Sequence, residues 1–130
     1  MSENLGLVRS IYAAWECGDY SSAEWAAPDI ENVFADGPEP GSVSGLPGAR
    51  AQFSRFLASF EGYRSQAQEY RELDDERILV FNTSTARGKS SGVEVITERA
   101  SVFHLRDAKV TRIVTYWDRD RALTDLGLTE

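Results

Sequence analysis

Two aspartates stand directly after apolar runs, in positions where a carboxylate could do acid–base chemistry. Asp36 follows the run 30–35, and Asp118 follows the run 109–117. A carboxylate at the wall of an apolar cavity can take a proton from a bound compound and return it. Each aspartate also has a structural interpretation, because Asp36 precedes a Gly-Pro pair and can open a turn, whereas Asp118 can cap a helix. For Asp36 the two interpretations are balanced, and for Asp118 the cap is favoured.

Other residue types that carry chemistry are scarce. The chain has one histidine, His104, and one cysteine, Cys17, which are too few for a zinc site or an intrachain disulfide. No glycine pattern of the phosphate-binding kind precedes a helix, and the acidic residues lack the spacing of a cation-binding loop. We therefore expect no metal and no cofactor. With 14 Lys and Arg against 21 Asp and Glu, the net charge of −7 argues against a nucleic-acid partner.

Length and hydropathy limit the organisation of the chain. Its 130 residues are the size of one ordinary domain, so we expect a single domain over residues 1–130. No apolar run approaches the roughly 20 residues that a membrane-spanning helix needs, and no membrane association is expected. The first residues lack the basic start and apolar run of a secretory signal. These observations favour a cytoplasmic location.

The apolar residues change their period along the chain, from helical spacing to strand alternation. Spacings of three and four predict helices over 3–16 and 47–62, and a short helix through 23–26 that ends at Pro28. A last helix is expected from about Asp118 to 126. Segregated helices and strands are typical of an α+β fold, here with an antiparallel meander. The predicted strands, rich in β-branched and aromatic residues, are 30–35, 63–73, 77–87, 93–105 and 109–117.

Three segments carry a resemblance to a known family. Residues 11–19 end in Gly-Asp after an aromatic residue and two alanines, residues 33–45 combine a strand, an acid and a loop, and residues 109–127 read as a closing strand and helix. In this order they resemble the SnoaL-like and ketosteroid isomerase-like branch of the nuclear transport factor 2-like superfamily. The resemblance implies a cone-shaped, curved antiparallel sheet wrapped around helices, a cystatin-like α+β roll, with one small-molecule pocket.

The resemblance also suggests roles for single residues. Asp36 lies nine residues before Gly45, which is where ketosteroid isomerases place their base, and Asp118 matches an acid that SnoaL-like cyclases use. This chain departs from the isomerases at the residues of their oxyanion hole. Ile11 stands where their tyrosine belongs, with Tyr12 beside it, and Ser101 replaces their neutral acid. True steroid isomerase activity is therefore not expected.

An epoxide hydrolase of the same superfamily is a less favoured interpretation. Residues 97–101 resemble the Arg-x-Asp strand of that branch, with Arg99 in the arginine position. Its two acidic positions align with Ser101 and Thr115. Most of the groups needed to activate water on an epoxide are therefore missing.

The leading hypothesis is a cofactor-independent enzyme of the isomerase or cyclase type, which transfers a proton on a hydrophobic carbonyl compound with Asp36 as base. The alternative is a non-catalytic module that binds a lipophilic ligand or forms a dimer. We expect a homodimer whose partner covers Val102, His104, Val114 and Tyr116. Strand and helix periodicity place the following residues at the pocket: Ile11, Trp15, Phe34, Phe53, Phe56, Asn82, Ser84, Arg99, Ser101, Phe103, Ile113, Thr115 and Trp117.

Overall fold

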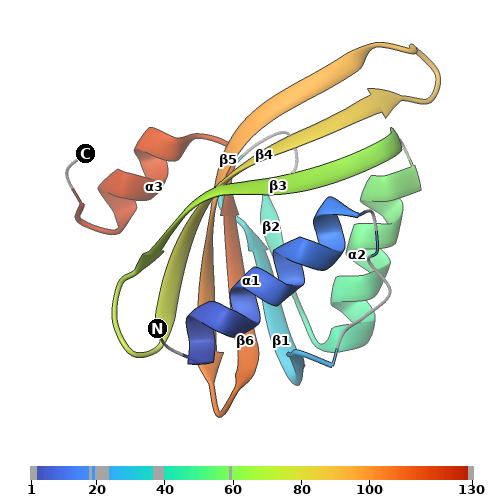
Figure 1. The fold of residues 1–130 in the computed structure, drawn as a ribbon. Coiled ribbons are helices and arrows are strands. Elements are labelled where there is room, and N and C mark those ends of the chain that lie inside the picture. The colour runs from blue at the N-terminus through green and yellow to red at the C-terminus, as the bar shows by residue number, and fades with distance from the viewer. Residues whose placement is uncertain (1–2, 18, 20–23, 37–39, 59, 129–130) are drawn as a thin grey trace.

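A curved, unclosed sheet of six strands forms the body of the molecule, with the strands in the order β2-β1-β6-β5-β4-β3 (Figure 1). This computed structural model describes residues 3–17, 19, 24–36, 40–58 and 60–128, without the side chain of Phe56. The α+β fold expected from the sequence is confirmed. Its elements are α1 (Glu3–Glu16), β1 (Ala26–Phe34), β2 (Gly41–Ser44), α2 (Leu46–Ala58), β3 (Phe60–Glu72), β4 (Arg77–Gly88), β5 (Glu94–Arg106), β6 (Lys109–Tyr116) and α3 (Arg119–Asp125).

The antiparallel meander predicted for the second half of the chain runs from β3 to β6. Its first turn is closed by Asp74, whose carboxylate accepts a hydrogen bond from the backbone N–H of Glu76 at 2.8 Å. The last hairpin turns through Asp107 and Ala108. Both residues have positive φ, as a two-residue turn between strands with a right-handed twist requires. These local turns explain why the strand order could be predicted from sequence spacing.

The segment after α1 differs from the prediction. A short helix was expected through 23–26, but Ala26 begins β1; residues 20–23 lie outside the described part of the chain. Strand β1 runs parallel to β6, with Ala26 opposite Val110 and the Val110 N–H donating to the Trp25 carbonyl at 2.7 Å. Pairing with a strand more than 80 residues away along the chain thus overrides the local helical signal.

The boundaries of two further elements differ from the prediction for the same reason. The loop expected before α2 contains β2, which pairs with β1 from Glu31 opposite Ser44 to Phe34 opposite Gly41. Phe60 does not extend α2 but starts β3, opposite Gly88. In both places hydrogen bonds to a neighbouring strand decide the structure, and no short-range pattern reveals them.

The two faces of the sheet pack against different helices (Figure 1). On the concave face, α1 contributes Val8, Ile11 and Tyr12 to a cluster with Ile78 and Phe103. On the opposite face, α3 closes a second cluster. A cavity lies between α1, α2 and the strands of the concave face.

The sheet face expected to meet a partner subunit is largely covered by the chain itself. Val102 and Tyr116 are 2% and 7% exposed and pack in one cluster with Ala122 and Leu123 of α3. This corrects the expectation for these two residues, since the C-terminal helix takes the place given to a partner. His104 and Val114 are half-buried. A homodimer stays a prediction.

Candidate functional site

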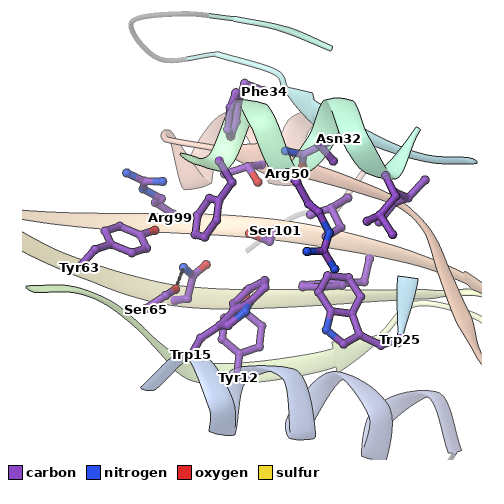
Figure 2. Close-up of a pocket in the computed structure, with 18 residues that line it drawn as sticks. Tyr12, Trp15, Trp25, Asn32, Phe34, Arg50, Tyr63, Ser65, Arg99 and Ser101 are labelled. Atoms are coloured by element: carbon purple, nitrogen blue, oxygen red, sulfur yellow. Dashed lines mark hydrogen bonds between the residues drawn. The ribbon is translucent and has the colours of Figure 1, made fainter. Parts of the chain in front are cut away.

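A cavity of about 160 Å³ lies between α1, α2 and the concave face of the sheet (Figure 2). Helix α1 forms its floor in this view, α2 its roof, and β3, β4, β5 and β6 its back wall. It is lined by Tyr12, Trp15, Trp25, Ile30, Asn32, Phe34, Leu46, Ala49, Arg50, Phe53, Tyr63, Ser65, Asn82, Arg99, Ser101, Phe103, Ile113 and Thr115.

Aromatic rings make up much of the apolar wall. Trp15 stands edge-on to Tyr12, with ring centroids 5.1 Å apart, and to Trp25, with centroids 6.1 Å apart. Phe53 stands edge-on to Tyr63 at 6.2 Å. Edge-to-face contacts of this kind hold aromatic rings in defined orientations. The wall therefore offers fixed flat surfaces against which another ring can stack.

Tyr12 and Ser101 form a hydroxyl pair within this wall. Tyr12 is 1% exposed and Ser101 is 5% exposed, and the Ser101 side chain lies close enough to Tyr12 to act against the rise in its pKa. Burial raises the pKa of Tyr12 well above its usual value of 10.0, because the phenolate would lose its hydration. Tyr12 therefore stays protonated near neutral pH and presents a hydroxyl donor.

The shifted pKa of Tyr12 predicts how stability depends on pH. Unfolded Tyr12 loses its proton near pH 10, whereas folded Tyr12 keeps it. Its contribution to the free energy of unfolding is therefore complete below about pH 10 and is lost above it, by about 1.4 kcal/mol per pH unit. Tyr12→Phe removes this titration, so wild type should lose stability relative to the variant as the pH rises above about 10. Urea unfolding measures this; a difference that stays constant would contradict it.

Strands β3 and β4 contribute two further pairs of polar side chains. The Asn82 amide donates to Ser65 Oγ at 2.9 Å, and the Tyr63 hydroxyl lies 3.2 Å from Ser84 Oγ (Figure 2 draws the Asn82–Ser65 bond). Asn82 Oδ1 is buried and accepts no hydrogen bond from any described residue. Because a buried acceptor without a donor is unfavourable, this oxygen offers a place for a donor on a bound compound.

Arg99 supplies a buried positive charge to the same wall. It is 6% exposed, and its guanidinium carbon lies 4.1 Å from the centroid of the Trp117 ring. Burial lowers the pKa of Arg99, while the nearby Tyr12 and Tyr63 act in the opposite direction. No aspartate or glutamate occurs among the described residues that line the cavity. The polar part of the wall is thus made of hydroxyl, amide and guanidinium groups.

Asp36 lies beyond the end of β1 and is not among the described residues that line the cavity. Its carboxylate accepts hydrogen bonds from the backbone N–H groups of Trp117, at 2.6 Å, and Asp118, at 3.3 Å. Both carboxylate oxygens are therefore used to join β1 to the end of β6. This geometry supports a structural role and gives no support to the base expected from the sequence.

Asp118 is the N-cap of α3. Its backbone is extended, and its carboxylate accepts from the N–H groups of Asp120 at 2.9 Å and Arg121 at 3.3 Å. The favoured interpretation of this residue is confirmed. Asp118 is exposed and is not among the described residues of the cavity wall, so its geometry gives no support to the catalytic alternative.

The other residues expected at the pocket fall into two groups. Three of them are not among the described lining residues. Ile11 is buried in the adjoining core, the Ser84 hydroxyl lies 3.2 Å from that of Tyr63, and Trp117 packs against Arg99. The side chain of Phe56 is outside the described part. Those that line the cavity are Trp15, Phe34, Phe53, Asn82, Arg99, Ser101, Phe103, Ile113 and Thr115.

Sequence reasoning missed several lining residues whose signals were present. Strand alternation from Phe34 indicates Asn32 and Ile30, and helical spacing pairs Tyr12 with Trp15. The family alignment instead favoured Ile11, one position away and on another face of the helix. Ala49 lies one helical turn before Phe53 on the predicted helix, and Tyr63 and Ser65 lie two apart on a predicted strand, so these three also had a signal. The remaining missed residues had none in the short-range pattern: Trp25, Leu46 and Arg50.

Residues 8–113 match the family described as the SnoaL-like domain. No curated protein matches the sequence significantly. Among solved structures, TerC, crystallised with polyporic acid, is 23% identical with a TM-score of 0.77, over 96% of this chain and 98% of TerC. A nuclear transport factor 2-like protein of unknown function from Burkholderia pseudomallei is 21% identical with a TM-score of 0.79, over 95% and 97% of the two chains.

A candidate SnoaL-like polyketide cyclase from Jannaschia sp. is 15% identical to the chain, with a TM-score of 0.77 over 98% of this chain and 94% of the cyclase. At these identities the structural likeness establishes the fold. No helix in the described part of the chain is long and apolar enough to cross a membrane.

Proposed function

The chain belongs to the SnoaL-like domain family, and from this premise we propose that it binds a small, largely apolar ring compound that carries an oxygen-containing polar group. The observation that carries the proposal is the cavity itself, with aromatic rings on one part of its wall and buried hydroxyl, amide and guanidinium groups on another. A wall of this composition is typical of small-molecule sites.

The size of the cavity limits the ligand. Its volume of about 160 Å³ is close to that of an engineered apolar cavity of about 150 Å³ that binds benzene. One or two rings therefore fit inside. Longer compounds would extend out of the cavity.

The polar part of the wall selects the ligand's functional group. Protonated Tyr12 and Ser101 suit a carbonyl or ionised oxygen, while Asn82 Oδ1 suits a hydroxyl or amine donor. A ligand without such groups would leave these buried atoms unpaired, which is unfavourable. TerC, a protein of the same fold, was crystallised with a small molecule, polyporic acid.

Binding rather than proton transfer is the function that the geometry supports best. The side chains that usually move protons are histidine and the carboxylates, and the described lining residues include neither. The isomerase or cyclase hypothesis relied on Asp36, whose carboxylate is bonded to two backbone N–H groups. The alternative of a lipophilic-ligand module needs no such base.

Filling the cavity tests the proposal. Ala49 and Ala51 both lie on α2, but Ala49 lines the cavity and Ala51 is exposed. In Ala49→Phe the new ring occupies ligand space, so binding of 2-acetylnaphthalene, measured by calorimetry, should weaken at least about tenfold, whereas Ala51→Phe should match wild type. Equal binding by both variants and wild type would place the ligand elsewhere.

A further inference from the structure

Building on the proposed function, we infer that the preferred ligand is an acid whose anionic group binds at Arg99 while its ring lies against the aromatic wall. The charge of the wall is the first support. Arg99 and Arg50 both line the cavity, and its described lining residues include no aspartate or glutamate. The whole chain carries a net charge of −7. The cavity therefore has a local charge opposite to that of the molecule, and it attracts anions that the rest of the surface repels.

Arg99 is held in place by its neighbours. The Trp117 ring lies 4.1 Å from its guanidinium carbon, and Arg119 Nε donates to its carbonyl oxygen at 3.0 Å. The backbone of Trp117 is in turn bonded to the Asp36 carboxylate. A fixed guanidinium fork can bind a carboxylate with two parallel hydrogen bonds and little loss of side-chain entropy.

Two further polar side chains lie next to Arg99. Asn82 stands opposite Arg99 on the neighbouring strand, and Tyr63 lies beside Arg99 at one end of the cavity (Figure 2). Because Arg99 is 6% exposed, water competes weakly for its charge, so a charged hydrogen bond here is stronger than at the surface.

Arg50 adds a second positive charge to the cavity wall. It is exposed on α2, and Figure 2 shows its side chain reaching from that helix toward Trp25. Its charge adds to the attraction that Arg99 exerts on an anion. Since Arg50 is in water, its effect on affinity is smaller than that of Arg99.

A set of ligands with one ring system and different charge tests the inference. Calorimetry with 2-naphthoate, 2-naphthamide and 2-naphthylmethylammonium should give the tightest binding for the naphthoate, about ten- to hundredfold tighter than the amide, and the weakest for the ammonium. Binding of the amide or ammonium as tight as that of the naphthoate would overturn the acid inference and leave the proposed function intact. Absence of binding by all three would contradict the proposed function itself.

Variants of the arginines locate the selectivity. Arg99→Met should remove the preference for naphthoate over naphthamide, and Arg99→Lys should keep part of it. Arg50→Met and Arg55→Met each remove one charge from α2, but Arg55 is exposed and is not among the described lining residues. We expect Arg50→Met to weaken naphthoate binding about two- to fivefold and Arg55→Met to leave it unchanged. Equal effects of Arg50→Met and Arg55→Met on naphthoate binding would overturn the inference. An undiminished preference for naphthoate over naphthamide in a folded Arg99→Met variant would also overturn it. If Arg99→Met does not fold, the comparison of Arg50→Met with Arg55→Met decides.

Discussion

Replacement of Phe103 by alanine should lower the free energy of unfolding by about 3–5 kcal/mol. Phe103 is fully buried on β5, and the centroid of its ring lies 5.8 Å from that of Tyr12 and 6.4 Å from that of Trp15. Since a domain of this size is stabilised by about 5–15 kcal/mol in total, this is a large share. Urea unfolding of both proteins measures the effect.

Two controls separate lost packing from other causes. Phe103→Leu keeps most of the buried volume and should lose less than half as much stability. In Phe103→Ala the space left by the ring joins the ligand cavity, so a bound aromatic compound should raise the melting temperature of the variant more than that of wild type. A loss below about 1 kcal/mol would show that the core does not depend on this ring.

Replacement of Asp36 by alanine should cost about 2 kcal/mol and lower the melting temperature by roughly 5–10 °C, because two backbone N–H groups lose a charged acceptor. Binding of 2-acetylnaphthalene should stay within about twofold of wild type, since Asp36 is absent from the described cavity wall. Thermal unfolding and calorimetry on the same samples measure both.

Asp29→Ala is the matched control for Asp36→Ala. Asp29 is an exposed acid on β1, so its removal changes the net charge equally and should alter stability by less than about 0.5 kcal/mol. A catalytic Asp36 predicts the opposite pattern, with unchanged melting and a rate loss of about 10²- to 10⁴-fold in any turnover the protein shows. That pattern would restore the base hypothesis.

Much of the fold could be predicted from short-range signals. The helix over 3–16 has the bounds of α1, and the four long strands were placed within a few residues, because periodicity and turn residues are local. The errors at 23–26 and 41–44 lie where strands pair with distant segments. Pairing partners of this kind cannot be deduced from a window of neighbouring residues.

The cavity was harder to predict than the fold. Alternation along β5 indicated Arg99, Ser101 and Phe103 together, and all three line the cavity. The spacing of Asp36 suggested a base, but spacing cannot tell whether a carboxylate faces a cavity or accepts a hydrogen bond from a backbone N–H group 81 residues later. The family alignment, which was off by one position on the helix, favoured Ile11 over Tyr12.

The central claim is that a ring compound binds between α1, α2 and the concave face of the sheet. The three tryptophans report on this directly, because Trp15 and Trp25 line the cavity while Trp117 does not. Nuclear magnetic resonance of the indole N–H groups during titration with 2-acetylnaphthalene should show saturable shifts at Trp15 and Trp25 and smaller ones at Trp117. At the same ligand concentration the shifts at Trp15 and Trp25 should be much smaller in Ala49→Phe. Unchanged Trp15 and Trp25 resonances at saturating ligand, or equal shifts in Ala49→Phe, would contradict the account.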